Sequence, residues 1–315
     1  MSVGLPLKAP QTSPQDPGTA PAAVAPVAPV PAPTRGTAPV SRRPLWLSVV
    51  QYALLACVFV LFVVPLLWLF TSAVKPEADI YTWPLRWVPT SLELGNFVDA
   101  WNSAPFGRFF LNSIITTGVG TALEMTCAVL SAYAFAFVEF RWKKAVFILI
   151  LGSLMLPGHV TLLVNYITVA NLGWLNTYAG LILPGMGSAF AMFLVYQQMR
   201  TVSAELVDAA IMDGAGHWRR MTTIVVPLCT PMIVTGTLIV LIGKWNDFVW
   251  PLIVTSTADM RTLPIGLQFL RSQEGYTNWG AIMAGAVMVA APMLIVFFIG
   301  QRRIIGGIAA GAVKG

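Results

Sequence analysis

Three ionisable residues stand inside or at the edge of long apolar runs: Glu124, Lys244 and Asp247. Charges at membrane depth are energetically costly and tend to face a protein interior or a water-filled path. Asp247 follows Lys244 by three positions, so on a continuous helix the two side chains would share a face and pair. Trp245 and Asn246, between them, offer the stacking and hydrogen-bonding surfaces that sugars use. These five residues therefore either line a solute pathway or belong to an internal ion pair, with Glu124 satisfied by a neighbouring helix.

No pattern in the sequence is typical of covalent or nucleotide chemistry. His159 and His217 lie far apart, and all three cysteines fall inside apolar runs, so neither a metal site nor a disulfide framework is indicated. The only Gly-Lys pair is followed by Trp245 rather than by Ser or Thr, which excludes a phosphate-binding loop of the P-loop type. We expect no catalytic residue, no metal and no cofactor, and any energy from ATP must come through a partner.

The composition is that of an integral membrane protein. Hydrophobic residues make up 57% of the chain and charged residues only 10%, whereas a soluble domain carries about a quarter charged residues. The net charge of +6 could suggest nucleic-acid binding. The placement of the basic residues, however, explains it better as membrane topology, and no nucleic-acid partner is expected.

Six apolar stretches are long enough for membrane-spanning helices, which need about 20 residues each. The run 145–199 contains no Asp, Glu, Lys or Arg and is too long for one helix, and the polar residues Asn171, Gly173 and Asn176 divide it. The sequence thus predicts an all-α, polytopic membrane protein with six transmembrane helices, at about 45–74, 109–138, 145–169, 177–198, 228–255 and 278–300.

The basic residues predict which side each segment faces. With the N-terminus inside, the inner segments hold 13 of the 19 Lys and Arg residues, and five lie outside. Both termini and the segment 200–227 are therefore expected in the cytoplasm. Residues 1–44 hold eleven of the 23 prolines, a composition that cannot bury a core, so they are expected to form a disordered cytoplasmic tail.

The segment 203–227 is charged and separates two apolar runs, so it must project into water. It predicts a helix over 204–212, a turn at Asp213-Gly214 and a second short helix over 217–225 that leads to Pro227 at the next membrane entry. Two neighbouring alanines keep the first helix thin enough for another protein to approach closely. The carboxylates of Glu205, Asp208 and Asp213 would pair with arginines on that partner.

This segment resembles the cytoplasmic loop with which permeases of ATP-binding-cassette (ABC) importers dock onto their ATPases. The family spacing is kept, with Asp208 in place of glutamate and Val226 in place of leucine. Where the family usually has phenylalanine the chain has Met221, which would fill a similar apolar pocket more flexibly. The resemblance implies an ATPase-coupling loop made by Glu205, Asp208, Ala209, Ala210, Asp213, Gly214, Ala215, Met221, Ile224 and Pro227.

Residues 45–315 as a whole resemble the six-helix permease subunit of carbohydrate-type importers, a class that includes maltose and glycerol-3-phosphate systems. Leu-Asn-Ser at 111–113 and Trp-Asn-Asp-Phe at 245–248 carry the likeness. It implies a bacterial inner or plasma membrane location in contact with lipid, a second permease subunit, an ATPase homodimer and an extracytoplasmic solute-binding protein. It also implies a C-terminal ATPase contact through Gln301, Arg302, Gly311 and Lys314.

The expected substrate is a small molecule of the sugar or sugar-like class, either a disaccharide or oligosaccharide or of the glycerol-3-phosphate type. The segments 263–267 and 274–280 are similar to both branches. Lys244 and Arg271 would assist an anionic substrate unless Asp247 neutralises Lys244. The alternative function is a stand-alone secondary carrier or channel for small polar solutes. We see no doubled inverted repeat, and a carrier would not need the cytoplasmic loop.

Overall fold

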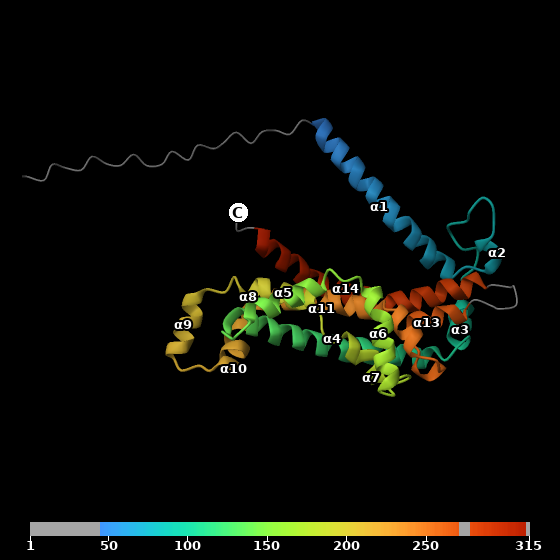
Figure 1. Ribbon diagram of the computed structural model, residues 1–315. Helices are drawn as coiled ribbons and strands as arrows, with labels where there is room; N and C mark the ends of the chain where they lie inside the picture. Colours follow the sequence, from blue (N-terminus) through green and yellow to red (C-terminus); the bar gives the residue numbers. More distant parts are fainter. Residues whose placement is uncertain (1–44, 271–277, 313–315) are drawn as a thin grey trace, which may run out of the picture. The chain divides into compact units, whose positions relative to one another are not determined.

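The computed structural model describes residues 45–270 and 278–312, and these residues form helices and connecting loops without a β-strand. The all-α class is therefore confirmed for this part of the chain (Figure 1). The expected tail, 1–44, lies outside the described residues, as do 271–277, which include Arg271 and most of the 274–280 segment, and the last three residues.

Seventeen helical segments follow one another along these residues. They are α1 (Leu45–Ala73), α2 (Glu77–Ile80), α3 (Gly95–Asn102), α4 (Phe106–Phe137), α5 (Lys143–Ser153), α6 (Gly158–Asn171), α7 (Tyr178–Ile182), η1 (Leu183–Gly185), α8 (Ala189–Met199), α9 (Ala204–Met212), α10 (His217–Arg220), η2 (Met221–Val225), α11 (Val226–Trp245), α12 (Val249–Val254), η3 (Ala258–Met260), α13 (Leu263–Phe269) and α14 (Trp279–Ala312).

Four stretches in the described part of the chain are long and apolar enough to cross a membrane: Trp46–Ala73, Phe106–Phe137, His217–Trp245 and Trp279–Gln301. The pair Tyr178–Gly185 and Ala189–Met199, bent by 46°, is a fifth candidate. The expected third span consists of two shorter helices, α5 and α6. Pro157 separates them, because a proline disfavours helical geometry in the residue before it. The count of six spans therefore stays a prediction.

The expected fifth span, 228–255, has different bounds in the structure. The helix begins before residue 228 and ends at Trp245, and a separate short helix, α12, covers Val249–Val254. Non-helical residues between the two, Asn246 to Phe248, break the predicted helix near its outer end. This break changes the geometry of the ionisable residues considered below.

The core forms where α4, α8 and α11 pack against one another (Figure 1). Small residues from α4 and α8 at this contact, Ala128, Ala132 and Ala191, are at most 2% exposed. Because lipid tails are as apolar as the helices, close backbone approach through small residues is a main source of helix association in a membrane. A second buried cluster joins α14 to α3, α4 and α13.

Polar side chains on α4 hold the loop that contains η3. The Asn112 amide donates to the carbonyls of Asp259 (2.7 Å) and Arg261 (2.9 Å), and its oxygen accepts from the Tyr178 hydroxyl (2.7 Å). The Ser113 hydroxyl accepts from the Leu263 N–H at 2.8 Å. Both polar residues of the Leu-Asn-Ser motif therefore position the loop that leads into α13.

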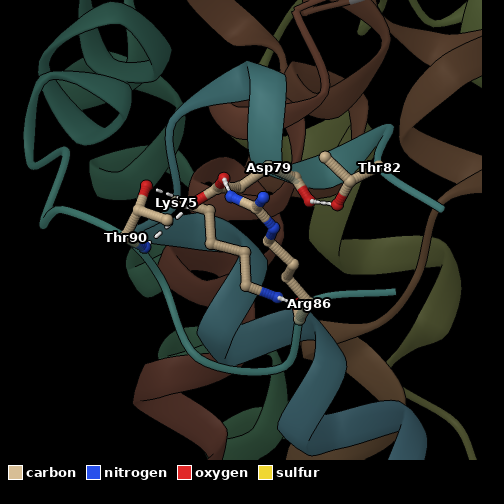
Figure 2. A network of polar contacts seen from close by, with 5 residues as sticks. All are labelled: Lys75, Asp79, Thr82, Arg86 and Thr90. Carbon is tan, nitrogen blue, oxygen red and sulfur yellow. Dashed lines mark hydrogen bonds and ion pairs between the residues drawn. The ribbon is translucent and has the colours of Figure 1, made fainter. Parts of the chain in front are cut away.

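A compact polar network fixes the loop between α1 and α3 (Figure 2). One oxygen of Asp79 accepts from the Thr90 N–H (2.9 Å) and hydroxyl (2.6 Å), and the other pairs with Arg86 at 3.2 Å. Lys75 is fully buried, donates to the Arg86 carbonyl and lies 4.1 Å from the ring centroid of Trp68. The hydrogen bonds from Thr90 and the nearby Arg86 lower the pKa of Asp79, and burial lowers the pKa of Lys75.

Asp79→Asn should loosen this loop at neutral pH. A carboxylate whose pKa is lowered by folding contributes stability that is present above its unfolded pKa, about 3.9, and is lost as the pH falls through the lower folded value. Hydrogen exchange of residues 76–94 should be faster in the variant than in wild type at pH 7, and the difference should shrink as the pH falls below 4. Asp99→Asn, on the exposed part of α3, is the control. An Asp79→Asn loop with wild-type exchange at pH 7 would contradict the role of the network.

Candidate functional site

The buried lysine of α11 pairs with a carboxylate of α4. Lys244 Nζ lies 2.8 Å from Glu124 Oε2 and donates to the Gly185 carbonyl at 3.0 Å. The lysine can reach Glu124 because Gly120 lies between them: a Cβ on Gly120 would come within 3.1 Å of the Lys244 side chain. The two side chains are only 19% and 10% exposed, so each charge depends on the other for compensation.

Lys244 pairs with Glu124 and not with Asp247, so the predicted pair is wrong, whereas the expectation that a neighbouring helix satisfies Glu124 is confirmed. The prediction assumed that the helix continues through residue 247, but α11 ends at Trp245. Asp247 therefore lies beyond the end of the helix that carries Lys244, although both residues line one cavity. Among the salt bridges of the described residues none involves Asp247. Its carboxylate accepts from the Trp250 N–H at 3.4 Å.

A cavity of about 240 Å³ opens beside this ion pair. Lys244 and Asp247 line it together with Thr116 of α4, Asn165 of α6 and Trp250 of α12. The Trp250 indole N–H donates to the Gly180 carbonyl at 3.1 Å, which fixes the orientation of the ring. The cavity thus presents a carboxyl group, an amide, a hydroxyl and an aromatic ring, groups that can bind hydroxyl-rich ligands.

The other two candidate pathway residues point elsewhere. Trp245 is buried, and its indole N–H donates to the Val289 carbonyl of α14 at 3.0 Å. Asn246 is exposed and donates to the Ile242 carbonyl at 2.9 Å. Sequence reasoning missed Asn165 and Trp250 as cavity residues. The sequence did show that Trp250 follows Asp247 by three positions. Both residues line the same cavity, however, only because the helix breaks after α11.

The segment 203–212 of the candidate coupling loop folds as predicted. Helix α9 covers Ala204–Met212, and the chain then turns at Asp213-Gly214 (Figure 1). Gly214 has a φ of +74°, and its N–H bonds the Ile211 carbonyl at 3.0 Å, while the Ala215 N–H bonds the Ala210 carbonyl at 2.9 Å. This pair of bonds is a Schellman motif, which needs a left-handed residue at the position of Gly214.

The second part of the loop differs from the prediction. Helix α10 (His217–Arg220), the π-helical turn η2 and α11 follow without interruption, so His217–Trp245 is one continuous helical stretch. Pro227 does not mark a break. Because proline has no N–H to donate, the turn before it widens, and the Val226 N–H bonds the Met221 carbonyl five residues back. The second part of the loop, from His217 onward, and Lys244 consequently lie on one helix.

The loop residues differ in how far they face solvent. Glu205, Asp208, Ala209, Asp213 and Pro227 are exposed, whereas Ala215 and Ile224 are half-buried. Ala210 and Met221 are buried, and Met221 packs in the chain's own core cluster against α4 and α8. Sequence reasoning missed the large apolar side chains that α9 and α10 leave exposed: Leu206 at 51%, Ile211 at 49%, Met212 at 87% and Trp218 at 69%.

The C-terminal candidates belong to or follow α14. The Gln301 amide donates to the Phe298 carbonyl at 3.1 Å inside the helix. Gly311 falls within the bounds of α14, and Arg302 also lies on it, although the environment of its side chain is outside the described part. Lys314 lies outside the described residues. In the described part of the chain no group of three or more His, Cys, Asp or Glu side chains is placed to hold a metal ion.

The fold and the loop match a known class of membrane protein. Residues 124–307 match the model of the binding-protein-dependent transport system inner membrane component family. The chain belongs to this family, so it is an inner-membrane transport component and not an enzyme. The matched segment includes the ion pair, the cavity residues on α6, α11 and α12, and the loop between α8 and α11.

Individual relatives are similar over most of their length. The probable ABC transporter permease protein YurM of Bacillus subtilis is 35% identical over 80% of this chain and 83% of its own. The sn-glycerol-3-phosphate transport system permease protein UgpE of Escherichia coli is 32% identical over 85% and 98%. The diacetylchitobiose uptake system permease protein NgcG of Streptomyces coelicolor is 30% identical over 85% and 89%.

A solved structure confirms the fold. In the crystal structure of a bacterial ABC transporter involved in the import of the acidic polysaccharide alginate, one chain matches with a TM-score of 0.75 at 20% identity. The match covers 83% of the present chain and 98% of that chain. At this identity the likeness concerns the fold alone. It confirms that the helices described above have the arrangement of an ABC transporter chain.

Removing one member of the ion pair should destabilise the protein more than removing both. Lys244→Met or Glu124→Gln leaves a mostly buried charge unpaired, so each should lower the free energy of unfolding by about 3 kcal/mol. The double variant should recover most of that loss. Thermal unfolding of the purified, detergent-solubilised protein measures all three.

Asp247→Asn is the matched control for this experiment. Because Asp247 has no salt-bridge partner among the described residues, its neutralisation leaves no partner charge unpaired, and the free energy of unfolding should stay close to the wild-type value. If Asp247→Asn cost as much as Lys244→Met, Asp247 would be the lysine's partner and the assignment to Glu124 would fail.

Proposed function

We propose that this protein is a permease subunit of an ATP-driven importer in which the loop of residues 200–227 docks onto a partner ATPase. The observation that carries the proposal is the unbroken helical stretch from His217 to Trp245. Its first turn lies in the exposed loop and its last turn carries Lys244 beside the cavity. A displacement of the loop is therefore transmitted as a displacement of one wall of the cavity. Residues 45–315 act as the permease domain, with 1–44 as an accessory tail.

The proposed docking surface combines apolar and acidic groups. Met212 and Trp218 are among its most exposed side chains, and the same loop exposes the carboxylates of Glu205, Asp208 and Asp213 as well as the basic Arg219. Exposed large apolar side chains rimmed by polar residues are typical of a protein-binding surface. The partner surface is expected to present an apolar groove with arginines at its edge, and the C-terminal residues 301–315 supply a second contact with the same ATPase.

The assembly is proposed to include a second permease subunit, two copies of the ATPase and an extracytoplasmic solute-binding protein. The family description names a binding-protein-dependent system. A further structural neighbour, at a TM-score of 0.59, is a bacterial alginate ABC transporter in complex with an alginate pentasaccharide-bound periplasmic protein. In such an assembly the present chain contributes the path and the coupling, while the ATPase carries out ATP hydrolysis.

The charge balance of the cavity supports a neutral sugar rather than glycerol-3-phosphate as the transported solute. Glu124 compensates Lys244 at 2.8 Å, so the lysine is not free to bind a phosphate. The remaining ionisable group, Asp247, would repel an anion when it is charged and can accept hydrogen bonds from sugar hydroxyls. Trp250 supplies a ring for stacking against the apolar face of a sugar. Of the relatives, NgcG is named for diacetylchitobiose, a neutral sugar.

Gly214→Val should uncouple the ATPase from the permease, and Gly216→Val should not. At the φ of +74° of Gly214 an L-residue costs about 1–2 kcal/mol, which is enough for about a tenfold loss of ATPase recovery. Gly216 has a φ of −66°, and a Cβ there would meet open space. The tagged protein would be purified from its native membrane and the partners quantified by mass spectrometry. If no ATPase were recovered with wild type, a stand-alone carrier would be the better account.

The exposed apolar residues of the loop provide an independent test that leaves the backbone intact. Met212→Ser and Trp218→Ser remove side chains that are 87% and 69% exposed, so protein stability should not change. Recovery of the ATPase should fall by about tenfold or more, as for central residues of an interface. Met155→Ser, which alters a methionine that is 86% exposed between α5 and α6, is the matched control. Equal recovery in all three variants would contradict docking through this surface.

A further inference from the structure

A second cavity, far along α4 from the ion pair, lies between the ends of α4, α5 and α8. It has a volume of about 640 Å³. Its apolar wall is a chain of aromatic rings in which Phe147 lies 5.3 Å from Phe135 and 4.7 Å from Tyr196, between ring centroids. Its rim carries three basic side chains: Lys143, Lys144 and Arg200. All of these residues lie in the described part of the chain, and the proposed ATPase-docking surface uses none of their side chains.

The charge in this cavity is only partly compensated. Glu139 is the one acidic residue of the lining, and it pairs with Lys143 at 2.9 Å. Among the described residues neither Lys144 nor Arg200 has an ion-pair partner. No side chain caps the N-terminus of α5, so the first backbone N–H groups of that helix add to the positive potential. The cavity is therefore suited to an anion.

The cavity continues into a surface that is suited to hydrocarbon. Ala145 and Phe147 belong to its lining, and the next residues of α5, Ile148 and Leu149, are 68% and 76% exposed. Trp142, at 67% exposure, stands at the entrance with the guanidinium of Arg141 located 5.5 Å from its ring centroid. Aromatic and basic residues grouped at the end of an apolar helix are typical of a membrane interface. An apolar helix face that begins at a cationic cavity matches the two parts of a phospholipid.

We propose that this cavity binds the headgroup of an anionic glycerophospholipid, with the acyl chains along the exposed face of α5. The phosphate would accept from Lys144 and Arg200, and the glycerol region would lie against the aromatic wall. A soluble anion would use the basic rim but not the apolar face of α5. A zwitterionic lipid would use the apolar face but would leave the positive charge uncompensated. The site is separate from the solute cavity and from the docking surface around Met212 and Trp218, although Arg200 begins the segment 200–227.

Lys144→Gln and Arg200→Gln test the site directly. The full-length protein would be purified with the subunits that accompany it, and native mass spectrometry would count the retained phosphatidylglycerol against phosphatidylcholine. Each substitution removes a charge-assisted hydrogen bond, so the affinity for phosphatidylglycerol should fall by about tenfold. Both side chains are exposed at the rim, and the melting temperature in phosphatidylcholine should stay at the wild-type value.

Arg219→Gln is the control, because it removes one exposed positive charge that lies outside the cavity lining. It should keep the retained lipid. The proposal is overturned if phosphatidylglycerol and phosphatidylcholine are retained equally, or if Arg219→Gln lowers retention as much as Lys144→Gln. It is also overturned if inorganic phosphate displaces no lipid but raises the melting temperature of wild type and not of Lys144→Gln or Arg200→Gln. The site would then hold a free anion. A photo-reactive side chain at Phe140 should cross-link lipid, and capture of a protein subunit would overturn the proposal.

Discussion

The ion pair between Glu124 and Lys244 is the constraint on which the functional half of the molecule depends. Two charges at membrane depth are tolerated only when they compensate each other, so the pair fixes the rotation of α11 against α4. The additional bond from Lys244 to the Gly185 carbonyl ties η1 to the same point. This one contact therefore positions the parts of the cavity wall that come from α4, α11 and η1. It also sets the net charge of the cavity.

The ion pair lies near the C-terminal end of α11, so it can receive motion that is transmitted along this helix from the loop. The stretch His217–Trp245 has 29 residues, and at about 1.5 Å per residue it spans roughly 40 Å. The Schellman motif that ends α9 fixes the turn just before this stretch, and the ion pair holds its opposite end. The wide turn at Met221–Val225 and Pro231 are the places where the helical hydrogen-bond ladder departs from regularity. Bending between loop and cavity is therefore expected at these places, and the rest of the stretch should move as one body.

The sequence predicted local features well and long-range ones poorly, for physical reasons. Helix α9 has the predicted bounds because its termination signal, Gly214, acts within a few residues. The partner of Lys244 could not be found in this way, since Glu124 lies far away along the chain and is brought near only by helix packing. The rule for residues three apart favoured Asp247 because it assumed a continuous helix. Apolar composition alone does not divide the 145–169 stretch, since both halves are equally apolar, and the local signal for its interruption is Pro157.

The C-terminal end of α8 connects the lipid site to the coupling loop. Tyr196 and Arg200 line the proposed headgroup cavity, and α9 begins at Ala204, only four residues beyond Arg200. The basic residues that predict the orientation of the chain are in part the same residues that would hold the lipid. A lipid anchored there would fix the start of the loop at the membrane surface, while α11 carries its other end. Motion of the ATPase would then swing α9 and α11 relative to a stationary α8, which is the relative displacement that opening a cavity between α6, α11 and α12 requires.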